Sequence, residues 1–258
     1  MIDIHAHIIP GLDDGPADME ASVGMGHIYA GEGVSCVFST SHSKEVAEEG
    51  RPAIEERLGE VHAAWHGAGI PVDIVLGVEV YLSPDTVGDL RDGRLWTLGE
   101  SRYVLVEVPY QPWPVYADAA LFDLRLAGYV PILAHPERYT AIQDNPAKML
   151  DLLEHGVLCQ VTAGALLLKS GNAVRRTAEL LVRHRLAQFI ATDAHSPHWR
   201  SPDVREALRA AEHLAGEEAV RAMTVDNPLH VLADSPIEPN PEPISSPRGR
   251  FGGLFGRD

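Results

Sequence analysis

The sequence predicts an α/β protein whose parallel strands form a barrel, and three observations lead to this fold class. Short apolar runs alternate with longer stretches of helical periodicity, which is the pattern of a parallel sheet with right-handed crossovers. The apolar runs are mostly continuous, as in strands covered on both faces. Seven strand–helix units fit within 258 residues. This number favours a (β/α)7, TIM-like barrel over the alternative of a doubly wound open sheet.

Each predicted strand is short and rich in Val, Ile and Leu, as buried parallel strands are. In chain order, the predicted strands are Ile2–His7, Val34–Thr40, Val72–Glu79, Tyr103–Val108, Val130–His135, Val157–Thr162 and Gln188–Asp193. Strands separated by helical stretches need crossover connections, so we expect neighbouring strands to run parallel.

The predicted helices fill the intervals between the strands, and several have Pro or Asn near the start and Gly near the end. They are Asp18–Ala30, Pro52–Gly67, Ala117–Ala127, Pro146–His155, Asn172–His184 and Pro202–Ala215. Helical spacing places Met19, Val23 and His27 on one face of the first helix. The same spacing gives the second helix an apolar face made of Ile54, Leu58, Val61 and Trp65.

The end of the chain differs in composition from the rest. Residues 235–258 are rich in Pro, Gly and Ser and lack the apolar periodicity that a packed core needs. We therefore expect residues 1–234 to form the folded domain and residues 235–258 to form an extended or disordered tail.

Charge and hydropathy exclude two classes of partner. The formal net charge is −16, whereas non-specific nucleic-acid binding needs a basic face. No run of about 18 apolar residues is present, so we expect no insertion into a membrane. The first residues lack the basic and apolar segments of a secretory signal, and we expect a cytoplasmic protein.

The two cysteines, Cys36 and Cys159, lie in apolar, strand-like runs and are interpreted as buried, reduced thiols. A cysteine nucleophile of the Cys-x5-Arg type needs an Arg six residues after it. His42 and Ala165 occupy these two positions, so neither cysteine fits that mechanism.

Residues that commonly bind metals occur where the predicted strands end. The candidate ligands are His5, His7, Asp14, His42, Glu79, Glu107, His135, Asp193 and His195. In a parallel barrel these strand ends meet at one rim, where barrel enzymes have their active sites. Alternate residues of a strand point the same way, so His5 and His7 can bind one ion. The mixture of imidazoles and carboxylates suits Zn, Mn or Fe.

Six short motifs resemble, in order, those of the PHP-superfamily phosphoesterases. They are Ile4–His7 with Asp13–Gly15, Thr40–His42, Gly77–Glu79, Val106–Glu107, Ala134–Arg138 and Thr192–His195. Within that superfamily the chain is most similar to bacterial protein tyrosine phosphatases of capsule and exopolysaccharide loci (CpsB/YwqE type). The resemblance covers roughly residues 1–232, and it implies that residues 1–234 form a PHP phosphoesterase domain.

The resemblance implies a PHP fold, which is a distorted seven-stranded barrel, with three divalent metal ions. Manganese is favoured, with Fe, Zn or Co as alternatives. The first ion would be bound by His5, His7, Glu79 and Asp193. Glu79 would bridge to a second ion, which Glu107 and His135 also bind, and the third ion would be bound by Asp14, His42 and His195. Arg138 and Arg200 match catalytic arginines that lie near the phosphate.

The resemblance also implies an activity, the hydrolysis of phosphotyrosine by a metal-activated water without a phosphoenzyme. The expected partner is a phosphotyrosine protein, namely the Tyr-rich tail of a membrane-associated tyrosine autokinase that controls exopolysaccharide and capsule synthesis. The loop Tyr110–Tyr116 either grips the phosphotyrosine ring or caps the barrel core.

Three alternatives share parts of this pattern. A small-molecule PHP phosphatase with a histidinol-phosphate-like substrate would use the same ligands. A catalytically silent PHP scaffold would lack some of them, and none of the expected residues is missing. An amidohydrolase-type barrel would need a metal-bridging Lys at a strand end, a position that Lys169 does not occupy.

Overall fold

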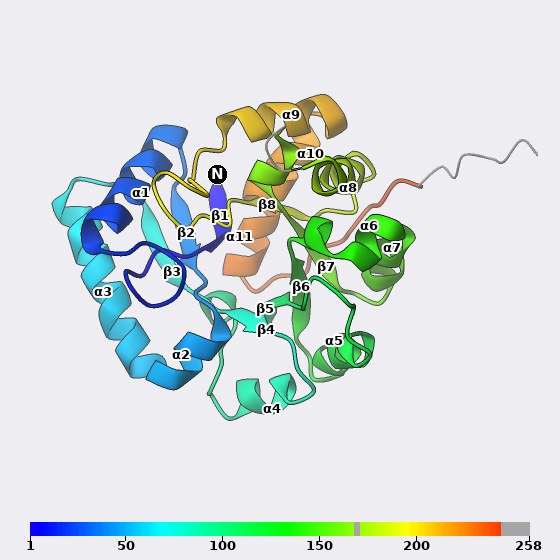
Figure 1. Ribbon diagram of the computed structural model, residues 1–258, viewed down its shortest axis with the longest axis horizontal. Coiled ribbons are helices and arrows are strands. Elements are labelled where there is room, and N and C mark those ends of the chain that lie inside the picture. Colours follow the sequence, from blue (N-terminus) through cyan, green and yellow to red (C-terminus); the bar gives the residue numbers. More distant parts are fainter. Residues whose placement is uncertain (168–170, 244–258) are drawn as a thin grey trace, which may run out of the picture.

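The strands lie at the centre of the molecule and the helices surround them (Figure 1). The computed structural model describes residues 1–167 and 171–243. One parallel sheet has the order β1–β2–β3 and contains β1 (Ile2–Ala6), β2 (Cys36–Ser39) and β3 (Asp73–Leu76). The other has the order β4–β5–β6–β7–β8 and contains β4 (Glu79–Tyr81), β5 (Tyr103–Glu107), β6 (Val130–Ala134), β7 (Leu158–Thr162) and β8 (Phe189–Ala191). Every strand pairing within these sheets is parallel, as predicted.

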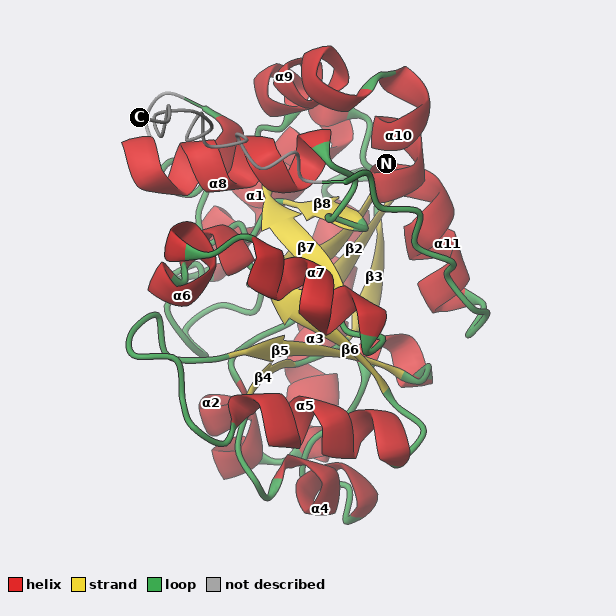
Figure 2. Ribbon diagram, turned by 90° about the vertical axis from the view of Figure 1, so that its right-hand side faces the viewer, coloured by secondary structure: helices red, strands yellow, loops and turns green. Residues whose placement is uncertain are grey.

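Helices surround the two sheets on the outside. The α-helices are α1 (Met19–Glu32), α2 (Ser43–Glu49), α3 (Arg51–Gly67), α4 (Thr86–Arg91), α5 (Ala117–Leu126), α6 (Thr140–Asp144), α7 (Ala147–Glu154), α8 (Asn172–Arg183), α9 (Arg205–Ala215), α10 (Glu217–Arg221) and α11 (Asn227–Leu232). Shorter helical segments are η1 (Leu98–Glu100), η2 (Pro136–Arg138), η3 (Ala163–Leu166) and the π-helical η5 (Ala222–Asp226). Figure 2 shows the strands from the side, with α8 and α9 beyond one edge and α4 and α5 beyond the other. None of the helices described has the length and hydropathy that crossing a lipid bilayer requires.

Backbone hydrogen bonds join the two sheets at both ends, so that the strands form a closed ring. Directly after β8, the N–H of Asp193 donates to the carbonyl of His5 in β1 over 2.8 Å. At the start of β4, the N–H of Glu79 donates to the carbonyl of Thr40, directly after β2, over 3.3 Å. The predicted barrel is therefore confirmed, and the open doubly wound sheet is excluded.

The third predicted strand is divided in two, so its prediction as one continuous strand was wrong. β3 ends at Leu76 and pairs with β2, whereas β4 begins at Glu79 and pairs with β5. The step occurs at Gly77, where a Cβ atom would lie 2.7 Å from the Leu98 side chain. This step brings Glu79 beside His42, with which it forms an isolated parallel bridge.

The residues that helical spacing places together on one face of α1 are not its most buried residues. Met19 and Val23 are only partly buried, and His27 is exposed. The buried residues of α1 are Ser22, Met25, Gly26 and Tyr29. Gly26 has no side chain, and the indole of Trp65 from α3 packs directly against it. The apolar face predicted for α3, to which Trp65 belongs, is confirmed.

The predicted tail begins in an extended segment that follows the barrel surface. The hydroxyl of Tyr103 donates to the carbonyl of Ser235 over 2.6 Å, and Ile237 packs against the core. The N–H of Glu242 donates to the carbonyl of His184 over 2.8 Å. Residues 244–258 of the predicted tail, and Lys169, lie outside the described residues.

Candidate metal centre

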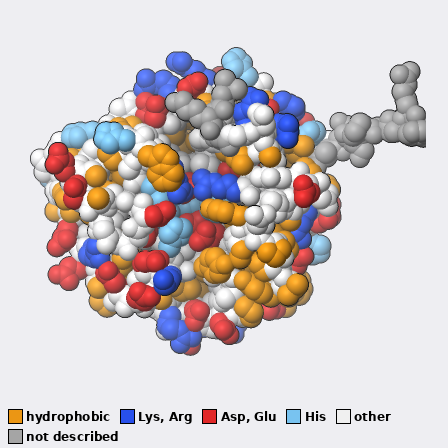
Figure 3. All heavy atoms as spheres, in the orientation of Figure 1, with side chains coloured by type: hydrophobic (Ala, Val, Ile, Leu, Met, Phe, Trp, Pro, Cys, Tyr) orange, Lys and Arg blue, Asp and Glu red, His pale blue; other side chains and the backbone are white. Residues whose placement is uncertain are grey.

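The predicted ligands come together at the carboxyl ends of the strands, where Figure 3 shows histidine, acidic and basic side chains gathered in a hollow of the surface. Four groups can each hold an ion, because the ligand atoms of each group lie within 4.8 Å of one another. These groups are His7, Asp14, His42 and His195; His5, His7 and Asp193; His5, Glu79 and His135; and His42, Glu79 and Glu107. Together they contain all nine residues proposed from the sequence.

Strand β1 places the first two histidines. His5 lies within the strand and His7 follows it, so both rings point toward the same end of the barrel. Both side chains are fully buried, and their ring centroids lie 5.6 Å apart. Their Nε2 atoms lie 3.2 and 3.3 Å from the Oε2 atom of Glu79.

Glu79 lies at the centre of the cluster and is 1% exposed. Its Oε2 atom is 3.2 Å from the Nδ1 atom of His42, and its Oε1 atom is 2.8 Å from the Nε2 atom of His135. Burial alone would raise the pKa of Glu79, but the charge of His5 and hydrogen bonds from His135 and His42 hold it well below its usual value. A carboxylate that faces several imidazoles in this way can bridge two cations.

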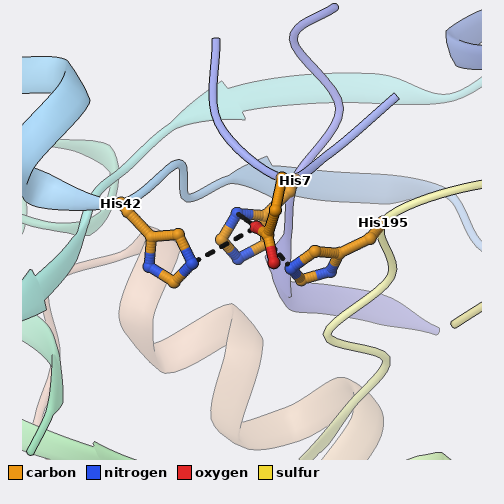
Figure 4. A group of neighbouring side chains, drawn as sticks. His7, His42 and His195 are labelled. Carbon is orange, nitrogen blue, oxygen red and sulfur yellow. Dashed lines mark ion pairs between the residues drawn. The ribbon is translucent and has the colours of Figure 1, made fainter. Parts of the chain in front are cut away.

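Asp14 organises the most exposed part of the cluster. Its Oδ1 atom lies 3.0 Å from the Nε2 atom of His195 and 3.3 Å from that of His42. Hydrogen bonds from these two histidines hold the pKa of Asp14 well below its usual value. Figure 4 shows His7, His42 and His195 converging on one space. Half of the Asp14 side chain is exposed, so this part of the cluster is open to a ligand from solution.

Several buried ligand atoms form no hydrogen bond of normal geometry among the described residues, although most of them lie within ion-pair distance of another charged group of the cluster. They are Nε2 of His5, His7 and His195, Nδ1 of His42 and His135, Oε2 of Glu79 and Oδ1 of Asp193. These atoms are nitrogen and oxygen donors turned toward shared spaces, so divalent cations fit the donor set.

Two residues that the sequence analysis missed orient the buried histidines. The Nδ1 atom of His7 is hydrogen-bonded to Oδ2 of Asp13 over 2.8 Å, and that of His5 to Oε1 of Gln160 over 2.9 Å. Both contacts leave Nε2 free to face the cluster, as the outer partners of metal-binding histidines do. Asp13 also accepts a 3.2 Å hydrogen bond from the N–H of His42. In the sequence, the signals for these two residues were a Gln within an apolar, strand-like run and a second Asp beside Asp14.

The two predicted arginines lie at the edge of the cluster. Arg138 donates from Nη2 to Oδ2 of Asp193 over 2.7 Å. Arg200 pairs with the other oxygen of Asp193, and its Nη1 atom is 3.7 Å from Asp14. Burial alone would raise the pKa of Asp193, but the charges of His5, Arg138 and Arg200 hold it well below its usual value. Both guanidinium groups retain N–H donors for an anion.

Three residues of the site have a left-handed backbone that non-glycine residues rarely adopt. The φ angles are 37° at His135, 51° at Asp193 and 53° at Arg200. Such conformations cost on the order of 1–3 kcal/mol each and cluster at functional sites. Here they turn two candidate ligands and one arginine toward the same hollow.

The cysteines take no part in this cluster. Cys36 and Cys159 are both buried and free, as predicted. Burial raises the pKa of the Cys36 thiol to about 12, and it raises that of Cys159 well above its usual value. Neither residue supplies the thiolate that a cysteine-dependent phosphatase needs.

The chain is similar to known proteins over most of its length. The family model for capsular polysaccharide synthesis proteins of the CpsB/CapC type matches residues 1–233. The tyrosine-protein phosphatase YwqE of Bacillus subtilis is 31% identical over 256 residues, which cover 99% of this chain and all of YwqE. The tyrosine-protein phosphatase CpsB of Streptococcus pneumoniae is 26% identical over 92% of this chain and all of CpsB.

Solved structures give the same result. A chain from the crystal structures of B. subtilis YwqE and S. pneumoniae CpsB, described as unique metal-dependent tyrosine phosphatases, superposes with a TM-score of 0.90. It is 31% identical, and the match covers 95% of this chain and all of that one. A phosphotriesterase homology protein from Escherichia coli, at 12% identity and a TM-score of 0.61, shares the fold. On the extent of these matches, the chain belongs to the CpsB/CapC family of capsular polysaccharide synthesis proteins.

Proposed function

We propose that this chain is a metal-dependent protein tyrosine phosphatase that acts in exopolysaccharide or capsule synthesis. The observation that carries the proposal is the convergence of nine ligand residues on one buried cluster with two arginines at its edge. The metal-dependent tyrosine phosphatase activity named for YwqE and CpsB supports it.

The proposed cluster holds three divalent cations, with manganese favoured and Fe, Zn or Co as alternatives. We assign His5, His7, Glu79 and Asp193 to the first ion, and Asp14, His42 and His195 to the third. We assign Glu79, Glu107 and His135 to the second ion; Nε2 of His135 lies 2.8 Å from Oε1 of Glu79 and 3.9 Å from Oε2 of Glu107. When bound, divalent cations in such a site lower the pKa of water and stabilise negative charge on phosphoryl oxygens. They also give a protein of net charge −16 a local attraction for a phosphate dianion.

The arginines bind the phosphoryl group in this proposal. Arg138 and Arg200 each use one N–H group on Asp193, and their remaining donors stabilise charge on the phosphoryl oxygens. In this proposal water attacks the phosphorus directly and no phosphoenzyme forms; Cys36 and Cys159 are buried outside the cluster, so neither can form a cysteinyl phosphate. A phenolate with a pKa of about 10 is a better leaving group than an alkoxide, which favours an aryl phosphate as substrate.

The proposed physiological substrate is the phosphorylated, Tyr-rich tail of a membrane-associated tyrosine autokinase, and the proposed location is the cytoplasm. The capsular polysaccharide family supports this partner. A folded domain of residues 1–234 would carry the whole site, since every assigned ligand precedes residue 196.

The test is hydrolysis of a phosphotyrosine peptide and p-nitrophenyl phosphate after chelation, and after addition of Mn, Zn, Fe or Co. We expect chelation to abolish both activities and at least one metal to restore them. His5→Ala and Glu79→Ala should abolish turnover while circular dichroism remains that of a folded protein, and His27→Ala, on the exposed side of α1, is the matched control. Retained activity in both cluster variants would refute the proposal, and a preference for histidinol phosphate over the peptide would identify a small-molecule phosphatase instead.

A further inference from the structure

Large aromatic side chains remain exposed around the metal centre. Tyr81, Tyr110 and Trp199 are 48%, 48% and 68% exposed. They lie at the end of β4, after β5 and after β8, so all three come from the end of the barrel that carries the cluster. Apolar side chains border the hollow in Figure 3. Exposed aromatic surface beside a polar cluster indicates a binding surface for an apolar group.

Tyr110 is held on one side and open on the other. Its ring lies edge-on to His135 at 5.8 Å and 5.9 Å from the ring of Tyr139. Its hydroxyl accepts a hydrogen bond from Nη1 of Arg138 over 3.4 Å. Trp113 of the same loop packs against Tyr139, so this loop both covers the barrel and leaves one ring at the hollow.

Trp199 is exposed although its backbone is fixed. Its N–H donates to the hydroxyl of Ser196 over 2.8 Å, and that hydroxyl donates to the Trp199 carbonyl over 2.6 Å. The guanidinium carbon of Arg200 lies 5.6 Å from the centre of the Trp199 ring, which is cation–π distance. The indole therefore has a defined place beside this arginine without being packed into the core.

Tyr110 and Trp199 thus each contact one of the two arginines of the proposed phosphate site. The strands β5 and β8 are separated in the sheet by β6 and β7, so the two rings reach the hollow from different sides. In an aryl phosphate a single oxygen links the ring to phosphorus, and a phosphate held by Arg138 and Arg200 must therefore place its aryl ring close to these arginines.

We propose that Tyr110 and Trp199 bind the aromatic ring of the substrate's ester group and thereby make the site selective for aryl over alkyl phosphates. This inference rests on the proposed function and names the residues that choose its substrate. Offset or edge-on contacts between aromatic rings supply the selectivity, which an alkyl ester lacks.

Binding of two phosphonates tests the inference without depending on turnover. We expect the metal-loaded protein to bind phenylphosphonate about tenfold more tightly than methylphosphonate in calorimetric titrations. Tyr110→Ala and Trp199→Ala should each remove most of this preference. Tyr110→Phe keeps the ring without the hydroxyl contact to Arg138, so the preference should remain. Phe122→Ala, an equally exposed aromatic position on α5, is the matched control.

Three results would overturn the inference: equal affinity of the unmodified protein for both phosphonates, an equal loss of both affinities in the two Ala variants, or a preference for phenylphosphonate that survives in both Ala variants. The second result would mean that the rings only hold the arginines in place. Peptide hydrolysis by the unmodified protein, measured in parallel, separates the two proposals. If the unmodified protein hydrolysed the peptide but both Ala variants kept the preference for phenylphosphonate, only the ring-binding site would be wrong. If the unmodified protein hydrolysed no peptide but both Ala variants lost the preference for phenylphosphonate, the proposed phosphatase function would be wrong and the ring-binding site would stand.

Discussion

At the scale of single residues, the outer partners of the histidines decide which ring atoms face the cluster. Asp13 holds Nδ1 of His7 and also accepts from the N–H groups of Gly15 and His42. We predict that Asp13→Asn lowers the affinity for Mn or Zn by about 10–100-fold, because the amide is a weaker acceptor for the imidazole. A competition titration against a chelator measures this change. Glu56→Gln removes an exposed carboxylate of α3, and an equal affinity in both variants would contradict the prediction.

The charge state of His7 predicts a second effect. Burial alone would lower the pKa of His7, but Asp13 and Glu79 raise it to about 9. At pH 7 the metal-free protein therefore carries a proton on His7, whereas a metal ion requires the neutral ring. Metal binding should release protons, and the apparent affinity should rise from pH 7 toward pH 9 and fall at lower pH.

Calorimetric titrations at pH 7 in buffers with different ionisation enthalpies measure this release. The observed heat should depend on the buffer in the unmodified protein and in the His27→Ala control. Heats that do not change with the buffer would mean that the ligands are already deprotonated.

Among single residues, the sequence predicted best the metal ligands that lie at the ends of strands. All nine predicted ligands converge because the carboxyl ends of parallel strands meet at one rim. The outer partners escaped prediction because they depend on packing between distant segments: Gln160 lies 155 residues from His5, to which it is hydrogen-bonded. Trp199 escaped for a similar reason, since only the folded loop brings its ring to Arg200.

At the scale of elements, the packing of α1 on α3 depends on a glycine. A Cβ atom on Gly26 would lie 2.9 Å from the Trp65 ring and 2.8 Å from Ile70, whereas one on Gly31 would meet nothing within 4 Å. We predict that Gly26→Ala lowers the free energy of unfolding by about 1–2 kcal/mol, because overpacking outweighs the gain in helix propensity. Gly31→Ala, in the same helix, should raise it by about 0.5–1 kcal/mol. Urea unfolding compares the two variants. Similar stabilities would show that the Trp65 side chain can move away from the added methyl group without a loss of folding free energy.

The same helix shows why some elements were predicted less well than others. Helical spacing placed Met19, Val23 and His27 together, but contact with Trp65 turned the face containing Gly26 inward. The six longer predicted helices are present, whereas α2, α4 and α6 contain 7, 6 and 5 residues. Two turns or fewer give too little periodicity to be recognised. The break between β3 and β4 was hidden because Val72–Glu79 is apolar throughout its middle.

At the scale of the whole molecule, four of the nine ligands lie at the two seams that close the barrel. His5 and Asp193 face each other across the seam between β1 and β8, where Nε2 of His5 lies 3.4 Å from Oδ1 of Asp193. His42 and Glu79 face each other across the seam between β2 and β4, at 3.2 Å. Cations bound by these pairs would therefore connect segments that only a few backbone hydrogen bonds join.

This arrangement predicts that metal removal destabilises the entire fold as well as the site. Ions that bind the folded chain alone stabilise it by about 2.7 kcal/mol at a concentration 100 times the Kd. For a domain of this size each kcal/mol changes Tm by about 2–4 °C, so chelation should lower Tm by roughly 5–10 °C in a thermal melt. Glu79→Ala removes the carboxylate that the cluster shares and should melt at the same temperature with and without chelator. If the unmodified protein also melted at one temperature, the seams would be closed by packing alone, and the cations would serve catalysis without holding the barrel together.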